Sequence, residues 1–267
     1  MTVTDPTPVA GRPARPRLQM MAVAALAAVL AVLSLAPGGA PAGAGDNGPC
    51  DVPGPAEQTY VCDSYYGLVS RPPSAAELEY WAGRVPAQRT LFISTLAKSA
   101  EGRRYTVLSY YQRFVDGSPS DADIVYWSPL VTAPNGLRKL EAALLASIDL
   151  STEAWVEFAY SIQLFRTPGP FELAYWSDRA DATTRNKVAA ELSNTLEVRR
   201  ARVTGVYNND LGVDPDEPGR AYWAERLRTG TLYLDVRIAL RSTTTAYANP
   251  SPCSAAAAPV PTYYCAG

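Results

Sequence analysis

Residues 73–81 read PSAAELEYW, and the outline of this stretch recurs three more times along the chain. Four of the five tryptophans directly follow a tyrosine, whereas chance would give roughly 0.3 such dipeptides. Each of these tyrosines has a proline seven residues before it. The pairs are Tyr80-Trp81, Tyr126-Trp127, Tyr175-Trp176 and Tyr222-Trp223, and the prolines are Pro73, Pro119, Pro168 and Pro215. The spacings of 46, 49 and 47 residues between pairs predict a tandem repeat of four units.

Each unit has the pattern of three short helices. The first, over residues 60–69 and 105–115 in the first two units, ends at the proline, because proline cannot continue a helix. The residue after the proline is an acceptable N-cap, and Ser74 with Glu77 forms a capping box. The Tyr-Trp pair lies on the second helix, and apolar pairs four residues apart, such as Phe92 and Leu96, indicate a third. Since no run alternates as a strand does, we predict an all-α fold with about twelve helices between residues 59 and 248.

The fourth unit carries a family resemblance. Residues 211–223 read LGVDPDEPGRAYW, which resembles the bacterial domain-of-unknown-function family 4214. Units of that family have a Gly-Arg-x-Pro-Asp turn, a glycine and a Tyr-Trp pair, and the third unit here departs most from this pattern. The resemblance implies tandem helical units in a secreted or surface protein of bacteria, and it implies no established activity.

Residues 1–44 have the order of a secretory signal peptide. Arg12, Arg15 and Arg17 precede 17 residues without charge, 20–36, and Ala42-Gly43-Ala44 offers small residues for cleavage. The alternative is an uncleaved anchor, although 17 helical residues reach only about 26 Å of the ~30 Å hydrocarbon core. We therefore expect a secreted or cell-surface protein that touches a membrane only through this segment, if it remains uncleaved.

The four cysteines form two local pairs of one design. Cys50 and Cys62 are twelve residues apart, as are Cys253 and Cys265, and both pairs end in Thr-Tyr-x-Cys. Duplication of one loop favours Cys50–Cys62 and Cys253–Cys265 bonds over the two other pairings. A zinc site of four thiolates would need short Cys-x-x-Cys segments, which are missing. Residues 45–58 are expected to be a linker in which the first loop begins, and 249–267 a Pro/Ala-rich tail with the second loop.

The amino-acid composition excludes several classes of function. The 267 residues include no histidine, which excludes Ser-His-Asp and Cys-His catalysis. Lys and Arg number 24 against 26 Asp and Glu, without a basic stripe, so we expect no nucleic-acid partner. Nothing marks two carboxylates for one cleft, and we expect no cofactor. The prediction is a non-catalytic structural or adhesive protein at or beyond the bacterial cell surface, whose partner is a protein or a cell-envelope glycan. The alternative is a secreted carboxylate-dependent carbohydrate-active enzyme.

Three groups of residues have both a structural and a functional interpretation. The Tyr-Trp pairs are assigned to the repeat core rather than to a ligand platform, although adjacent helical positions lie about 100° apart, so some tyrosines should reach solvent. Arg199, Arg200 and Arg202 could complement a helix end or bind an anionic cell-wall polymer. The acidic turn could hold calcium or serve as turn and cap residues; it comprises Asn208, Asn209, Asp210, Asp214, Asp216 and Glu217.

The local cysteine pairing can be tested directly. Mass spectrometry of a non-reduced digest should yield cross-linked peptides for Cys50–Cys62 and for Cys253–Cys265. A peptide that joins Cys50 to Cys265 would contradict the pairing.

Overall fold

The computed structural model describes residues 48–50 and 54–248, and these residues are all-helical, without a strand. The all-α prediction is therefore confirmed. The signal segment, the tail, and the Cys253–Cys265 pair lie outside the described residues. One helix begins inside the predicted 45–58 linker, at Ala56, so that boundary is corrected.

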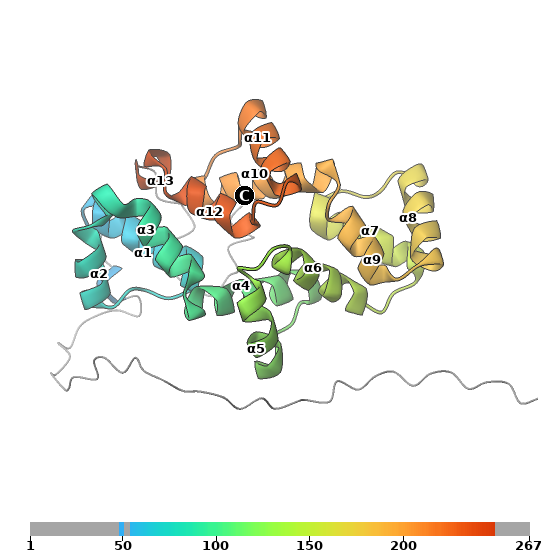
Figure 1. The fold of residues 1–267 in the computed structure, drawn as a ribbon, viewed down its shortest axis with the longest axis horizontal. Coiled ribbons are helices and arrows are strands. Elements are labelled where there is room, and N and C mark those ends of the chain that lie inside the picture. Colours follow the sequence, from blue (N-terminus) through green and yellow to red (C-terminus); the bar gives the residue numbers. More distant parts are fainter. Residues whose placement is uncertain (1–47, 51–53, 249–267) are drawn as a thin grey trace, which may run out of the picture. The chain divides into compact units, whose positions relative to one another are not determined.

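Thirteen α-helices follow one another in the described part of the chain, after a 3-10 turn at Gly48–Cys50 (Figure 1). Their bounds are α1 Ala56–Val69, α2 Ala75–Ala82, α3 Val85–Lys98, α4 Ala100–Val115, α5 Asp121–Leu130, α6 Gly136–Ser147, α7 Thr152–Leu164, α8 Pro170–Ala182, α9 Arg185–Leu192, α10 Leu196–Leu211, α11 Glu217–Arg228, α12 Tyr233–Arg241 and α13 Thr244–Ala248. The helices α1 and α4 begin four and five residues before the predicted starts, because the apolar pattern used for the prediction omits their polar first turns.

Four of these helices end in the same way. The residue after α1, α4, α7 and α10 has left-handed backbone angles, and the repeat-turn proline follows three residues later. The left-handed residues are Ser70, Asp116, Phe165 and Gly212. A left-handed residue reverses the chain at a helix end, and the proline prevents the helix from resuming.

N-caps start the helices that follow these turns. Ser74 and Ser120 each form a complete capping box, the second with Asp123. Asp216 accepts a hydrogen bond from the Gly219 N–H at 3.0 Å. Each cap satisfies backbone N–H groups that have no partner inside the helix, and it therefore sets where the helix begins.

Eight helices contribute most of the buried core, and four others bury one residue or none. Most core residues belong to α1, α3, α4, α6, α7, α9, α10 and α12, whereas α2 and α11 bury one residue each and α5 and α8 none. Trp155 of α7 is fully buried, and its indole N–H donates to the Leu145 carbonyl at 2.8 Å. The four outer helices are those that carry the Tyr-Trp pairs.

The two members of each Tyr-Trp pair differ in burial. The tryptophans are partly buried and pack against the core. The tyrosines are exposed, at 51% for Tyr80, 58% for Tyr126, 55% for Tyr175 and 54% for Tyr222. They are surface residues and not core residues, because only one of two adjacent positions on an outer helix can face inward.

The chain's early and late helices pack together. Within the described residues, α12 contacts α3, and α1 contacts α13. The Tyr60 hydroxyl on α1 donates to the Arg241 carbonyl on α12 at 2.6 Å. The N-terminal turn joins α1 through a Cys50–Cys62 disulfide, whose Cα atoms are 5.9 Å apart. This bond is the first of the two predicted cysteine pairs.

A buried carboxylate lies at this junction. Asp210 of α10 is 3% exposed, and both of its oxygens accept hydrogen bonds from Arg237, each at 2.9 Å. The Arg241 Nε atom lies 3.4 Å from Asp210 Oδ1. Arg237 also donates to the Gly67 carbonyl on α1 at 3.3 Å. Three helices that are distant in sequence therefore meet at one carboxylate.

Replacement of Asp210 tests this junction. We expect Asp210→Asn to lower the free energy of unfolding by about 3–5 kcal/mol, because it removes the buried charge that accepts two hydrogen bonds from Arg237 and faces the buried Arg241. Asp235→Asn is the matched control, since Asp235 forms an exposed ion pair with Lys98 at 3.2 Å and should cost about 1 kcal/mol or less. Urea denaturation of both variants measures the difference; equal losses would contradict the role given to Asp210.

Candidate functional site

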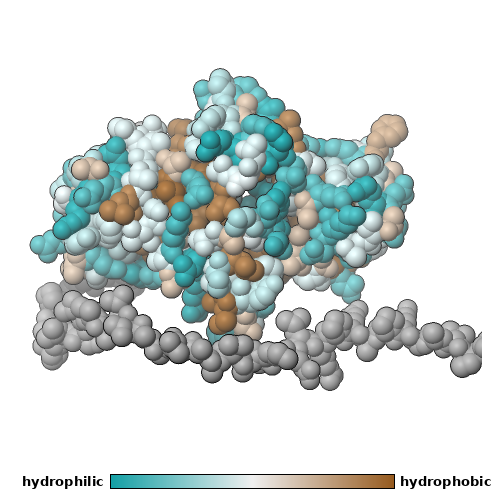
Figure 2. All heavy atoms as spheres, viewed as in Figure 1, coloured by the Kyte–Doolittle hydropathy of each residue, from teal (hydrophilic) through white to brown (hydrophobic). Residues whose placement is uncertain are grey.

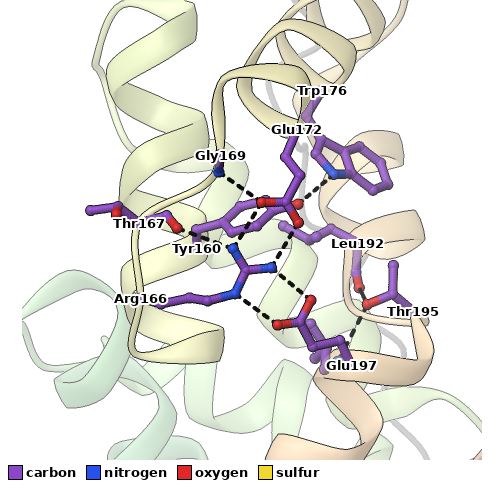
Figure 3. Close-up of polar contacts among 10 residues, drawn as sticks. Tyr160, Arg166, Thr167, Gly169, Glu172, Trp176, Leu192, Thr195 and Glu197 are labelled. Atoms are coloured by element: carbon purple, nitrogen blue, oxygen red, sulfur yellow. Dashed lines mark hydrogen bonds and ion pairs between the residues drawn. The ribbon is translucent and has the colours of Figure 1, made fainter.

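A buried tyrosine lies under the turn between α7 and α8. Tyr160 of α7 is 3% exposed, and its hydroxyl accepts a hydrogen bond from the Trp176 indole N–H at 2.8 Å (Figure 3). Burial raises the pKa of Tyr160 above its usual value. The hydrogen bond fixes the position of Trp176 at the inner side of α8.

One guanidinium bridges two carboxylates beside this tyrosine. Arg166 donates to both oxygens of Glu172 at 2.7 and 2.8 Å, and to both oxygens of Glu197 at 2.7 and 2.8 Å (Figure 3). Its charge lies 5.0 Å from the centre of the Tyr160 ring. Glu172 also accepts from the Gly169 N–H at 2.7 Å, which caps α8. Arg166 thus ties the start of α8 to the start of α10.

These hydrogen bonds keep the carboxylate ionised. Donation from Arg166, with a smaller effect of the Gly169 N–H, lowers the pKa of Glu172 to about 2. The pKa of Arg166 is raised in turn by Glu172 and Glu197. Both partners therefore keep their charges at neutral pH, and neither is poised to exchange a proton.

The same arrangement occurs at the turn between α1 and α2. Arg71 donates to both oxygens of Glu77 at 2.9 Å and to both oxygens of Glu101 at 2.5 and 3.0 Å. Its charge lies 5.1 Å from the Tyr65 ring centre. The Arg71 hydrogen bonds lower the pKa of Glu77 to about 2, and burial raises the pKa of Tyr65 to about 12.

The other two turns lack the arginine. Gly117 and Val213 occupy the positions that correspond to Arg71 and Arg166. Tyr111 still forms a hydrogen bond with Trp127 and faces Asp123, and its pKa is raised to about 12, chiefly by burial. The arginine bridge, which joins α2 to α4 and α8 to α10, is therefore present at alternate turns.

Sequence reasoning missed the tyrosines of this arrangement. Each lies five residues before the left-handed residue of its turn, a spacing that the sequence itself contains: Tyr65, Tyr111, Tyr160 and Tyr207. The signal that could have found them is the constant spacing of eight residues between each tyrosine and the proline of its turn, as from Tyr65 to Pro73.

An open hollow lies beside the Arg166 bridge. Tyr160, Trp176 and Leu192 line its floor, together with Glu172, Glu197 and Thr195. Two further lining residues, Phe171 and Tyr175, project from α8 and are 92% and 55% exposed. The hollow thus combines exposed aromatic faces with a fixed, paired set of charges.

The other candidate residues are dispersed. The carboxylate of Asp210 faces Arg237 and Arg241, and Asp216 caps α11, so these members of the acidic turn have structural partners. Among the described residues, no group of three or more His, Cys, Asp or Glu side chains could hold a metal ion. Of the three basic residues, Arg200 lies apart from the other two, since it pairs with Glu217 whereas Arg202 pairs with Glu141.

Figure 2 shows one face of the molecule coloured by residue hydropathy. Hydrophobic residues on this face are interspersed with hydrophilic ones. No helix in the described ranges is both long and apolar enough to cross a membrane. Comparisons with protein-family models, curated proteins and solved structures gave no match to this chain.

Acid pH tests the Arg166 bridge. Because the pKa of Glu172 falls from 4.5 unfolded to about 2 folded, its contribution to stability is complete above pH 4.5 and is lost as the pH falls towards 2. We expect Glu172→Gln to be less stable than wild type at pH 7, with the difference shrinking between pH 4.5 and pH 2.

Thermal denaturation across this pH range measures the effect. Glu157→Gln, which changes an exposed carboxylate on α7, serves as the control and should show no comparable pH-dependent difference. A Glu172→Gln difference that stays constant with pH would contradict the bridge.

Proposed function

We propose that the protein is a secreted, non-catalytic binding protein built from four tandem helical units, similar to family 4214, at or beyond the bacterial cell surface. Each unit has three helices, and α13 begins where a fifth would follow. The left-handed turn residues support this division, because they are separated by 46, 49 and 47 residues, like the Tyr-Trp pairs. Export rests on the signal-like sequence of residues 1–44.

The aromatic hollow on α8 is the binding site in this proposal, and its partner is a cell-envelope glycan. Phe171, with 92% of its surface exposed, carries the proposal. Exposing a phenyl ring to water is unfavourable, and clustered exposed aromatics are typical of binding surfaces. The positions corresponding to Phe171 in the other units hold Ala76, Ala122 and Pro218, so the third unit is distinct in this respect.

Tyr175 complements Phe171 in this role. Its ring lies edge-on to Trp176, with centroids 5.0 Å apart, and Arg179 lies 5.7 Å from its ring centre. These contacts hold the phenol in one place while leaving it accessible, which reduces the entropy lost on binding. Sugar rings have both apolar C–H faces and hydroxyl groups, so they match an aromatic face next to fixed carboxylates.

The charges of the hollow favour binding over catalysis. A glycoside hydrolase of the usual kind needs one carboxyl group whose pKa is raised so that it can donate a proton. The pKa of Glu172 is displaced in the opposite direction, to about 2. Glu197, its neighbour, is bound to the same arginine. The pair is suited to accept hydrogen bonds from hydroxyl groups rather than to transfer protons.

A glycan array followed by titration calorimetry tests the proposal. Wild type should bind a cell-envelope glycan, and the double variant Phe171→Ala/Tyr175→Ala should bind at least about tenfold more weakly. Tyr126→Ala is the matched control, because Tyr126 is an equally exposed tyrosine outside the hollow, and its affinity should remain that of wild type.

Three results would count against this function. They are binding of no glycan by wild type, equal binding by the double variant, and turnover of a polysaccharide. The last would favour the carbohydrate-active enzyme.

A further inference from the structure

The first turn of α6 carries basic side chains and no acidic one. Asn135, the residue before the helix, has left-handed angles and provides no side-chain cap, and the first turn holds no acidic residue. Instead it holds Arg138 and Lys139. Because the N-terminal end of a helix carries partial positive charge, basic residues there are unfavourable unless an anion is nearby.

Two arginines of α10 approach this helix end from another part of the chain. Arg202 pairs with Glu141 of α6 and donates to the Ser193 carbonyl at 3.0 Å. The Ser193 hydroxyl donates to Glu141 at 2.6 Å. Glu141 is only 2% exposed, so this carboxylate is already used by Arg202 and Ser193.

The guanidinium of Arg199 is only partly hydrogen-bonded. Arg199 is 8% exposed, its guanidinium donates to the carbonyl and side-chain oxygens of Asn194, and its buried Nε atom has no hydrogen-bond partner. Burial lowers the pKa of Arg199, and so do the charges of Arg228, Arg138 and Arg202, while Glu225 acts in the opposite direction. Burial and the Arg202 charge also lower the pKa of Arg138. The fold therefore holds three like charges close together.

These groups line one hollow. Its wall includes Arg138, Arg199, Arg202, Glu141, Asn135 and Ser193, from α6, α10 and the segment between α9 and α10. Three positive side chains face one negative one, so the lining carries an excess of two positive charges beside an uncapped helix end.

We propose that this hollow binds a phosphate group. Guanidinium groups donate paired hydrogen bonds to oxyanions, and helix N-termini bind phosphate through free backbone N–H groups. A phosphate would neutralise the excess positive charge of Arg138, Arg199 and Arg202 over Glu141. The group comes either from free inorganic phosphate or from a phosphate ester on a cell-envelope polymer. The site is separate from the aromatic hollow on α8 and does not depend on the function proposed for it.

The experiment uses the folded chain at constant ionic strength. Inorganic phosphate and glycerol phosphate are titrated separately by calorimetry, with chloride as the salt reference. At about ten times Kd, the bound anion should raise the melting temperature by about 3 °C. Response to both compounds indicates free phosphate as a sufficient ligand, whereas response to glycerol phosphate alone indicates the ester, and either supports a phosphate site.

Variants locate the site. Arg199→Gln should weaken binding at least about tenfold, and Arg226→Gln, which changes an exposed arginine on α11 outside the hollow, should bind as wild type does. If Arg199→Gln fails to fold, Arg138→Gln provides the same comparison. The proposal is overturned if neither compound binds above the chloride reference, or if the folded pocket variant binds as tightly as wild type.

Discussion

The buried carboxylate of Asp210 is the constraint on which the arrangement of the helices depends. It accepts hydrogen bonds from Arg237 and lies beside Arg241, while these arginines contact α1 through Gly67 and Tyr60. A charged group this deeply buried is tolerated only if its partners are in place. These hydrogen bonds link the late helix α12 to α1, and together with the packing of α12 against α3 they join the early and late helices.

Gly67 shows how closely this junction is fitted. A Cβ atom added there would lie 2.4 Å from Arg241 Nη1, well inside van der Waals contact. Glycine thus leaves room for the arginine where α1 and α12 approach. A side chain at position 67 would therefore displace the guanidinium of Arg241, whose Nε atom lies beside Asp210.

Inner and outer helices have separate roles in this molecule. The inner helices bury the apolar residues, and each outer helix is held by its tryptophan, which in α8 donates to a buried tyrosine. At two of the four turns an arginine then links the outer helix to the second inner helix after it: Arg71 joins α2 to α4, and Arg166 joins α8 to α10. Since the anchoring uses one face of an outer helix, the opposite face is available for exposed groups such as Phe171.

Local features follow from the amino-acid sequence alone: the helical class, the Ser74 and Ser120 caps, the proline turns and the Cys50–Cys62 loop. Each depends on residues within about a dozen positions, so periodicity and capping preferences are sufficient. Only the tertiary structure decided that Asp210 is an ion-pair partner, that Arg138 joins Arg199, and that the tyrosine of each Tyr-Trp pair faces outward. These outcomes depend on which helices pack together, and the free energy of that packing comes from contacts between residues far apart in the chain.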